Sequence, residues 1–414
     1  MNIIDTASLV LVSAALFAWI NHRYIKLPTT IGIMLIALLF SVFLLVLSNF
    51  GIGVGKEYAA RVISGIDFNR TLMDGMLSFL LFAGAMHVKL NELLDKKLLI
   101  GVLATFGVVS VTFIVGTVSY FLLPLFGLKI DFIYCLLFGS LIAPTDPVAV
   151  MAIMKNAGAS KGLETKLAGE SLFNDGVAVV VFLVILGIAT GEHEATAGSI
   201  AKLFAIEALG GIVFGLLLGL LGFYLLKTID NYKVEALITL ALVTGGYQMA
   251  LQLHTSGPIA VVVAGLLIGN QGRDHAMSKI TKTQLDHFWE LIDEILNALL
   301  FMLIGMEMIV IAISGNILLA GVLLAVIVLL ARFISVGIPT SILKLRQDFH
   351  PHLVKILTWG GLRGGISVAL ALSLPNGPER DIIVAITYII VVMSISIQGL
   401  TIGKLIKRTA PKAS

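Results

Sequence analysis

The sequence predicts an all-α polytopic membrane protein, because its composition is strongly apolar, its apolar segments recur at membrane-spanning length, and its positive charges alternate between loops. Hydrophobic residues make up 58% of the 414 positions and charged residues only 13%. An average soluble domain is about 25% charged. We therefore expect the chain to be embedded in a lipid bilayer.

Apolar segments follow one another along the whole chain. A hydrocarbon core of about 30 Å requires roughly 20 apolar residues per helix, and about thirteen segments approach that length. They cover residues 5–21, 28–49, 72–88, 98–127, 132–154, 167–190, 198–226, 234–252, 256–270, 284–311, 313–341, 353–374 and 381–405. Because the loops between them are short, we expect one membrane domain over residues 1–414 and no soluble domain.

The first segment is expected to be a retained helix. The opening stretch MNIIDTASLVLVSAALFAWINHRYIKLP has Asp5 where a secretory signal carries basic residues, and no small-residue cleavage site follows it. The connecting stretches 51–70 and 272–290 are amphipathic, so we expect them to lie at the membrane interface.

The positive charges predict the orientation of the spans. Most of the 28 Lys and Arg residues fall in alternate loops. Since cytoplasmic loops carry the excess of Lys and Arg, this bias supports about thirteen spans in the cell (plasma or inner) membrane, with the N-terminus outside and the C-terminus cytoplasmic. Arg332 and Arg363 are exceptions, because they fall within apolar segments.

The segment 132–154 contains LIAPTDPVAV, in which Asp146 lies between Pro144 and Pro147. Proline removes a backbone donor and frees a carbonyl from the helical ladder. Irregular backbone at membrane depth persists only where it packs in protein or lines a wet cavity. A carboxylate in a membrane helix costs roughly 2.5–3.5 kcal/mol, so Asp146 is a functional candidate, with a simple proline kink as the alternative.

The next segment reads AGESLFNDGVAVVVF over residues 168–182. On a helix, Ser171 and Asp175 share one face, and Glu170 and Asn174 share the adjoining one. Carboxylate, hydroxyl and carbonyl oxygens suit a hard cation. If the two aspartates lie close together, a cation and a proton compete for the same charge, and exchange follows. A structural cap around Asp175 is the alternative interpretation.

The segment 353–374 contains TWGGLRGGISVAL, where glycines flank Arg363 and weaken the helix. An arrangement of six spans, a linker span and six further spans inverts the second half, so span five corresponds to span twelve. Paired interrupted segments in the two halves point to a binding site at the membrane midplane. The expected helix-break residues are Pro144, Pro147, Gly361 and Gly364.

Together the motifs APTDPVAV, GESLFNDGVAVVVF and GGLRGGISVAL, in this order, resemble the monovalent cation:proton antiporter family, the sodium/proton exchangers of its bacterial and archaeal branch. The resemblance covers essentially the whole chain. It implies a homodimer in which spans 1–3 and 7–10 form the dimer scaffold. Spans 4–6 and 11–13 would form an ion-transporting core that moves like an elevator, with spans 5 and 12 crossing as broken helices.

The resemblance also implies roles for individual residues. Asp175 would carry the cation and the proton, Asp146 would share both tasks, and Ser171 and Thr145 would be further ligands of the alkali cation. Asn174 stands where the electroneutral branch carries asparagine beside the aspartate, which favours one cation for one proton. The expected cargo is Na⁺, or Li⁺, against H⁺, with no cofactor, nucleotide or nucleic acid.

In the family, the glutamate of the second motif is a structural partner of a core arginine. The candidates for pairing with Glu170 are Arg332 and Arg363. Arg332 is favoured, because Arg363 lies in the glycine break and can satisfy free carbonyls there. We expect Asn174, Glu170, Arg332 and Arg363 to form the structural core of the site.

One position departs from the family pattern. Members often carry a glutamate in span three, within a stretch like LLFEAA, but this chain reads SFLLFAGAMHVKL with Ala83 at that place. The ion preference is therefore left open, and a K⁺/H⁺ antiporter shares every feature above. A cation channel would need a repeated filter loop, and an intramembrane aspartyl protease a Gly-x-Gly-Asp string. Neither pattern occurs, so no enzymatic activity is expected.

Overall fold

The computed structural model of the protein describes residues 3–194, 196–344 and 350–409, and these residues fold into helices joined by short connections. Within them there is no β-strand, and an isolated β-bridge joins Asp146 to Leu362. The predicted all-α class is thus confirmed. Residues 1–2 and 410–414, the two ends whose side of the membrane the sequence predicts, lie outside the described residues.

The first half of the chain forms the elements up to α10. They are α1 (Ile3–Ile20), the π-helical turn η1 (Asn21–Ile25), α2 (Thr29–Asn49), α3 (Val54–Ser64), α4 (Phe68–Arg70), the π-helical turn η2 (Thr71–Met76), α5 (Leu77–His87), α6 (Leu90–Asp95), α7 (Lys97–Leu122), the 3₁₀ turn η3 (Leu123–Phe126), α8 (Phe132–Leu141), α9 (Val148–Ala157) and α10 (Lys161–Ala189).

The second half begins with the longest helix of the described chain. Its elements are α11 (Ala197–Lys227), α12 (Tyr232–Gln252), α13 (Gly257–Leu267), the π-helical turn η4 (Ile268–Gly272), α14 (Arg273–Ala276), α15 (Lys279–Glu307), α16 (Gly315–Leu343), α17 (Leu353–Trp359), α18 (Gly365–Leu372), α19 (Pro378–Met393), the π-helical turn η5 (Ser394–Gly399) and α20 (Leu400–Thr409). The expected connector 272–290 is not separate, since from residue 279 it continues as the first turns of α15.

Among the described residues, eight helices are long and apolar enough to cross a membrane. They cover Ile4–Ile25, Thr29–Asn49, Lys97–Phe126, Gly162–Ala189, Gly198–Lys227, Tyr232–Gln252, Gly315–Leu343 and Pro378–Thr409. The other predicted segments form shorter, broken or more polar helices, namely α5, α8–α9, α13, α15 and α17–α18. The chain is therefore a multi-pass membrane protein, while the count of about thirteen spans stays a prediction.

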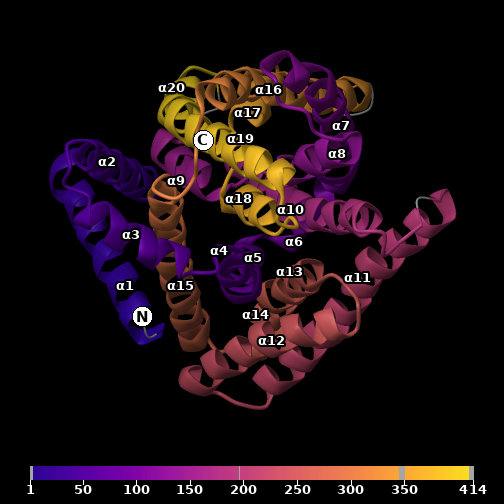
Figure 1. Cartoon of the computed structure of the whole chain (residues 1–414). Coiled ribbons are helices and arrows are strands. Elements are labelled where there is room, and N and C mark those ends of the chain that lie inside the picture. Colours follow the sequence, from indigo (N-terminus) through magenta and orange to yellow (C-terminus); the bar gives the residue numbers. More distant parts are fainter. Residues whose placement is uncertain (1–2, 195, 345–349, 410–414) are drawn as a thin grey trace.

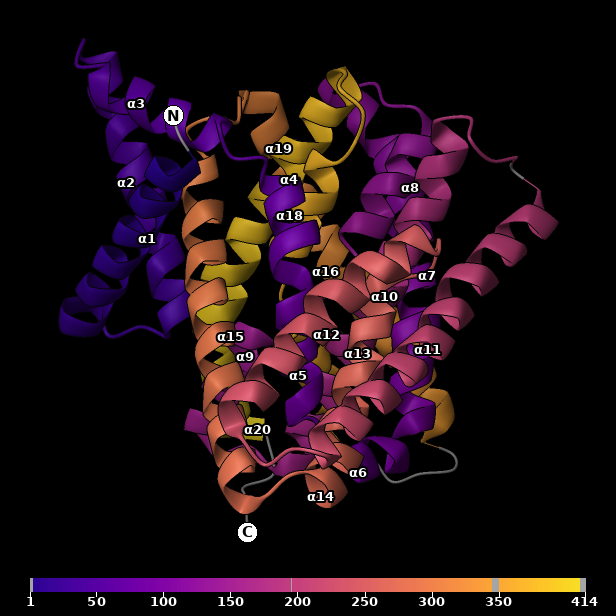
Figure 2. The same ribbon diagram turned by 90° about the horizontal axis from the view of Figure 1, so that it is seen from below.

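Two groups of helices lie on opposite sides of the molecule (Figure 1). In one group, α7 packs against α8, α10 and α16, and α19 packs against α16 and α18. In the other, α13 packs against α11 and α12. Helix α5 contacts α13 and α15, and α15 also packs along α2. Figure 2 shows the long helices side by side, with α3 and the start of α19 at one end of the molecule and α6 and α14 at the other.

Glycines allow the closest helix contacts. A Cβ atom at Gly139 on α8 would lie 2.2 Å from the carbonyl oxygen of Thr112 on α7, and one at Gly215 on α11 would lie 2.5 Å from that of Ala260 on α13. Small residues are common at helix contacts within membranes because they let the backbones approach. These contacts hold α8, which leads into the first helix break, directly against α7.

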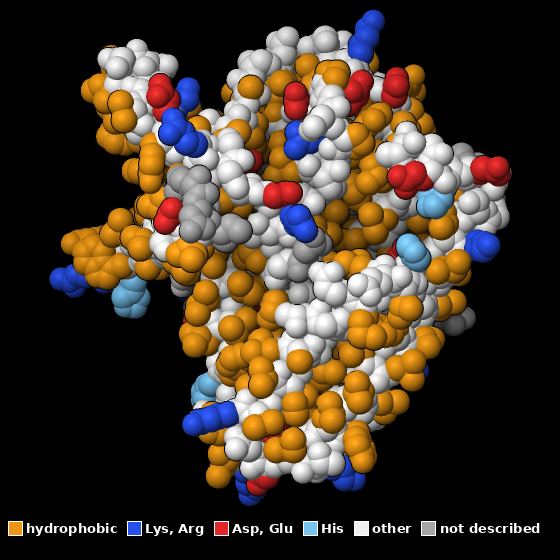
Figure 3. Space-filling model, turned by 60° about the horizontal axis from the view of Figure 1, so that its bottom comes forward, with side chains coloured by type: hydrophobic (Ala, Val, Ile, Leu, Met, Phe, Trp, Pro, Cys, Tyr) orange, Lys and Arg blue, Asp and Glu red, His pale blue; other side chains and the backbone are white. Residues whose placement is uncertain are grey.

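Apolar side chains cover much of the lateral surface. Figure 3 shows them as a broad area, with charged side chains mostly near its edges. On α11 and α16, for example, Leu217 is 61% exposed and Leu330 is 57% exposed. Such a surface is stable in contact with lipid chains, which agrees with the membrane location of the protein.

Candidate functional site

Two interrupted helices meet in the interior of the protein. The chain is not helical between α8 and α9 and again between α17 and α18. The backbone N–H of Asp146 in the first break donates to the carbonyl of Leu362 in the second, at 2.8 Å. Pro144 and Pro147 interrupt the hydrogen-bond ladder of the helix. The contact gives partners to the N–H of Asp146 and the carbonyl of Leu362, which have none within a helix.

Asp146 lies at the start of α9. Its Oδ1 accepts a hydrogen bond from the N–H of Val148, the first residue of α9, at 2.8 Å, which makes an Asx turn. A Cβ atom at Gly364 would lie 2.6 Å from Oδ2 of Asp146, and one at Gly361 would lie 2.8 Å from Nε of Arg332. The glycines of the second break therefore permit the close approach of the first break and of α16.

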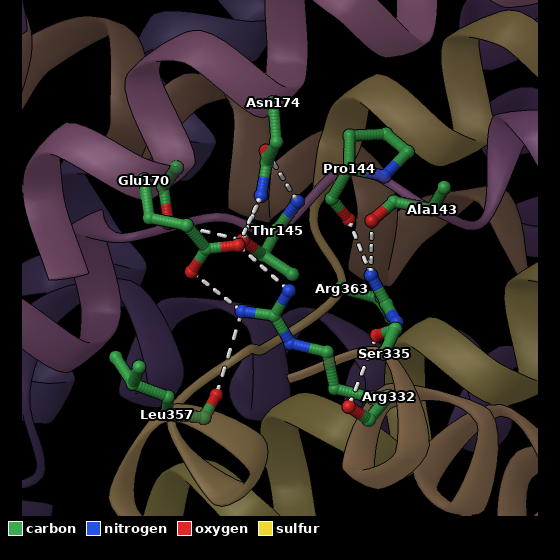
Figure 4. A network of polar contacts seen from close by, with 10 residues as sticks. Ala143, Pro144, Thr145, Glu170, Asn174, Arg332, Ser335, Leu357 and Arg363 are labelled. Carbon is green, nitrogen blue, oxygen red and sulfur yellow. Dashed lines mark hydrogen bonds and ion pairs between the residues drawn. The ribbon is translucent and has the colours of Figure 1, made fainter. Parts of the chain in front are cut away.

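Polar side chains on one face of α10 contact Thr145 of the first break (Figure 4). The N–H of Thr145 donates to Oδ1 of Asn174 at 3.2 Å, and Nδ2 of Asn174 donates to Oγ1 of Thr145 at 2.8 Å. Nδ2 of Asn174 also donates to Oε1 of Glu170 at 2.9 Å. The hydroxyls of Thr145 and Ser171 are 3.0 Å apart. All four side chains are buried, so hydrogen bonds between buried groups hold the break on α10.

Arg332 on α16 forms a bidentate ion pair with Glu170. Its Nη1 donates to Oε1 at 2.7 Å and its Nη2 to Oε2 at 2.5 Å. The side chains are only 4% and 0% exposed. The pair joins α10 to α16, in the geometry in which arginine binds a carboxylate most strongly.

Arg363 has different partners, all of them close to the two breaks. Its Nη1 donates to the carbonyls of Ala143 at 2.6 Å and Pro144 at 2.9 Å (Figure 4). Its backbone N–H donates to Oγ of Ser394 at 3.1 Å. The guanidinium thus donates to carbonyls that the proline interruption frees, and it is near enough to Asp175 to act on that carboxylate electrostatically.

Asp175 is 4% exposed, and its Oδ1 has no hydrogen-bond partner among the described residues. Asp146, Glu170 and Arg363 are near enough to act on it electrostatically. A buried carboxylate oxygen without a partner is costly, and such atoms in native proteins often belong to a site that binds an ion or takes part in chemistry. Asp175 therefore offers a carboxylate oxygen without a partner among the described residues, near Asp146 of the first break and Arg363 of the second.

The sequence analysis did not identify Ser394 and Gln398 on η5. Oγ of Ser394 donates to Oε1 of Gln398 at 2.6 Å, and Nε2 of Gln398 donates to the carbonyl of Trp359 at 3.2 Å. They connect the last long helix to the second break. The sequence signal that could have identified them is the polar stretch SISIQG within the otherwise apolar segment 381–405.

Ala83 lies in an apolar cluster together with Phe82 and Trp289. The face of α5 that meets α10 is formed there by Gly84, where a Cβ atom would lie 3.8 Å from Cδ1 of Leu172. This helix contributes no carboxylate at Ala83, so the oxygens described above come from the breaks and from α10.

Buried carboxylates at two interrupted helices inside an apolar helical bundle are typical of a secondary transporter. The family model described as sodium/hydrogen exchanger, transmembrane, matches residues 11–408. The chain therefore belongs to the sodium/hydrogen exchanger family.

Characterised relatives match over most of their own length. The chain is 50% identical over 409 residues to the Na(+)/H(+) antiporter NhaP of Pseudomonas aeruginosa, covering 98% of this chain and 96% of that one. It is 37% identical over 359 residues to the Na(+)/H(+) antiporter NhaH of Halobacillus dabanensis, covering 85% and 86%. The solved structure of the sodium proton antiporter MjNhaP1 from Methanocaldococcus jannaschii covers 98% of each chain with a TM-score of 0.77 and 20% identity, which confirms the fold.

Proposed function

We propose that the protein exchanges Na⁺ for H⁺ across the cell membrane. The observation that carries the proposal is the buried Oδ1 of Asp175, which has no hydrogen-bond partner among the described residues and lies near enough to Asp146 for the two carboxylates to interact electrostatically. The family membership and the activity named for the relatives support the same function.

The proposed cation ligands are oxygens of Asp146, Asp175, Ser171 and Thr145. The hydroxyls of Ser171 and Thr145 lie 3.0 Å apart, and both belong to the segments that carry the two aspartates. Oxygen ligands of this kind suit a hard cation. When the cation leaves, protons bind the same carboxylates, because metal ligands of this type must be deprotonated to bind. Competition at one site then produces exchange.

The charges of the site favour one cation for one proton. Glu170 is neutralised by its bidentate pair with Arg332. When Asp146 and Asp175 are both ionised, their two charges and the guanidinium of Arg363 leave one negative charge at the proposed ligands. One monovalent cation or one proton neutralises that charge. The neutral Asn174 adds none, so the proposed exchange is electroneutral.

Glu170, Arg332, Asn174 and Arg363 form the proposed structural core that holds the ligands in place. Asn174 donates to both Glu170 and Thr145, and Arg363 binds the carbonyls of the first break.

The proposed transport movement is that of an elevator. The contacts among α7, α8, α10, α16 and α19 support a core domain, and those of α13 with α5, α11 and α12 support a scaffold that forms the homodimer. The two parts meet where Gly176 of α10 faces Ile259 of α13, and a Cβ atom at Gly176 would lie 2.9 Å from Cγ1 of Ile259. A small residue at this contact suits sliding of one part along the other. The proposed orientation places the N-terminus outside and the C-terminus in the cytoplasm.

The test is dequenching of a pH-sensitive dye in inverted vesicles from antiporter-deficient cells. Wild type, Asp175→Asn and the control Asp286→Asn are compared after addition of Na⁺, Li⁺ or K⁺. Asp286 forms a partly exposed ion pair with Arg273 and makes none of the hydrogen bonds described for the site. We expect Na⁺-dependent dequenching in wild type and in the control, and none in Asp175→Asn. A response to K⁺ alone would identify a K⁺/H⁺ antiporter, and no response to any cation would refute exchange.

A further inference from the structure

A groove lies on the outside of the molecule between α16, α17 and α20. Its volume is about 540 Å³, and Leu330 and Phe333 of α16 and Trp359 of α17 are among its lining residues. Leu330 is 57% exposed and Phe333 is 51% exposed. Because α16 is one of the helices long and apolar enough to cross the membrane, this wall of the groove faces lipid chains. In Figure 1, α16, α17 and α20 lie at the edge of the molecule.

Three cations line the same groove. They are Lys355 on α17 and Lys404 and Arg408 on α20. Lys404 and Arg408 are four residues apart, so they share one face of the helix. All three are exposed, and none forms an ion pair with an acid in the described part of the chain. Among the described residues that line the groove none is acidic, so no carboxylate of that lining compensates its positive charge.

The groove also has a hydroxyl without a partner. Thr358 lines it and is 6% exposed, and its buried Oγ1 makes no hydrogen bond to the described residues. The lining thus combines an apolar wall, three cations and a polar atom that lacks a partner. These are the features of a site for an anionic amphiphile.

We propose that the groove binds one anionic phospholipid of the bilayer. The phosphate lies among Lys355, Lys404 and Arg408, and the acyl chains lie along Leu330 and Phe333. Basic residues at the end of an apolar membrane surface attract anionic lipid headgroups. A soluble phosphate would leave the apolar wall without an occupant, and a zwitterionic lipid would leave the cations without a net countercharge.

The position of the groove connects the lipid to the helix breaks. Helix α17 leads into the second break, and α20 packs against α9, which follows the first. A Cβ atom at Gly403 of α20 would lie 3.0 Å from Cγ2 of Ile153 on α9. The lipid therefore holds α17 and α20 together from outside. This site is separate from the proposed cation ligands, and its existence does not depend on which ion is exchanged.

The test uses the full chain purified in detergent. Native mass spectrometry measures the retention of phosphatidylglycerol and phosphatidylcholine, for wild type, for Lys404→Gln/Arg408→Gln and for the control Lys279→Gln/Lys282→Gln. The control removes two cations from the start of α15, outside the groove. Each cation near an anionic lipid is expected to contribute about fivefold in affinity, so the groove variant should lose roughly 25-fold. The control should keep the wild-type affinity.

Equal retention of phosphatidylglycerol by the groove variant and wild type, or equal retention of the two lipids by wild type, would overturn the proposal. Competition by free glycerol phosphate at the same concentration would also overturn it, because the site would then be one for soluble phosphate. If the double variant is not monodisperse, Lys355→Gln on α17 replaces it, and a loss of about fivefold is expected.

Discussion

The guanidinium of Arg332 on α16 binds both carboxylate oxygens of Glu170 on α10, at 2.7 and 2.5 Å, across 162 positions of sequence. Both side chains are almost completely buried. Glu170 also accepts from Asn174 at 2.9 Å, and Asn174 in turn holds Thr145 in the first helix break. The ion pair thus fixes the position of the break relative to two long helices.

We predict that Glu170→Gln destabilises the protein more than it alters ion selectivity. Removing one partner of a buried ion pair costs about 3–5 kcal/mol, because the remaining charge is left without compensation. Thermal unfolding of the purified protein measures the loss. In the control Arg273→Gln, which removes the partly exposed pair with Asp286, the cost should be about 1 kcal/mol or less. Well-folded Glu170→Gln protein with a changed cation preference would show that Glu170 is a ligand instead.

We predict that Gly364→Ala abolishes transport. Its Cβ atom would lie 2.6 Å from Oδ2 of Asp146, so the two breaks would have to separate. The control is Gly101→Ala on α7, where nothing lies within 4 Å of the added atom. This control should be neutral or gain roughly 0.5–1 kcal/mol, since alanine favours a helix over glycine. Dye dequenching in vesicles measures transport by both variants. Full transport by Gly364→Ala would contradict the close approach of the two breaks.

We predict that Ser394→Ala weakens the second break. The substitution removes the acceptor of the Arg363 N–H and the donor to Gln398, and leaving such groups unsatisfied costs about 1–3 kcal/mol. The control Ser110→Ala removes an exposed hydroxyl that bonds only to its own helix, and should cost less than about 0.5 kcal/mol. The unfolding temperatures of wild type and the two variants measure the effect. If both variants lower the unfolding temperature equally, Ser394 does not stabilise the second break.

We predict that acidification weakens the apparent affinity for Na⁺. At a pH where the site is protonated, one proton must leave before one Na⁺ binds. In that range the half-saturating Na⁺ concentration should rise about tenfold for each unit by which the pH is lowered. Initial rates in proteoliposomes at several pH values measure this slope. A half-saturating concentration that does not change with pH would show that the two cargoes bind independently.

We predict that transport is insensitive to membrane potential. Arg332 neutralises Glu170, and Arg363 offsets one of the two ionised aspartates, so the site binds one positive charge at a time. One Na⁺ then moves in one direction and one proton in the other, and no net charge crosses the membrane. Proteoliposomes clamped with potassium and valinomycin should show the same rate at zero and at a large potential. A rate that changes steeply with potential would require a different stoichiometry.

Much of the fold could be predicted from local patterns. Apolar length predicted the helices α2, α7, α10, α11 and α16, because membrane helices need a continuous apolar stretch. The shorter helices were less clear. Asp67 caps α4, and the following turns are π-helical, so the apolar segment 72–88 is not one regular helix. Segment length alone does not show where a helix widens or ends.

The site could be predicted in part. Pro144, Pro147 and the glycines of the second break predicted interruptions, since their effect on a helix is local. The spacing of Glu170 and Asn174 also predicted their shared face. The contact of Asp146 with Leu362, and the acceptor role of Ser394, depend on packing between distant helices. No periodicity in one segment contains that information, so these contacts required the structure.

The most direct test of the account is proton release on cation binding. NaCl is added to purified protein in weak buffer, and the change of pH is recorded for wild type and Asp175→Asn, with choline chloride as the control salt. Competition at Asp175 and Asp146 predicts release of about one proton per bound Na⁺ in wild type, and none in Asp175→Asn. Saturable Na⁺ binding to wild type without proton release would contradict the shared site.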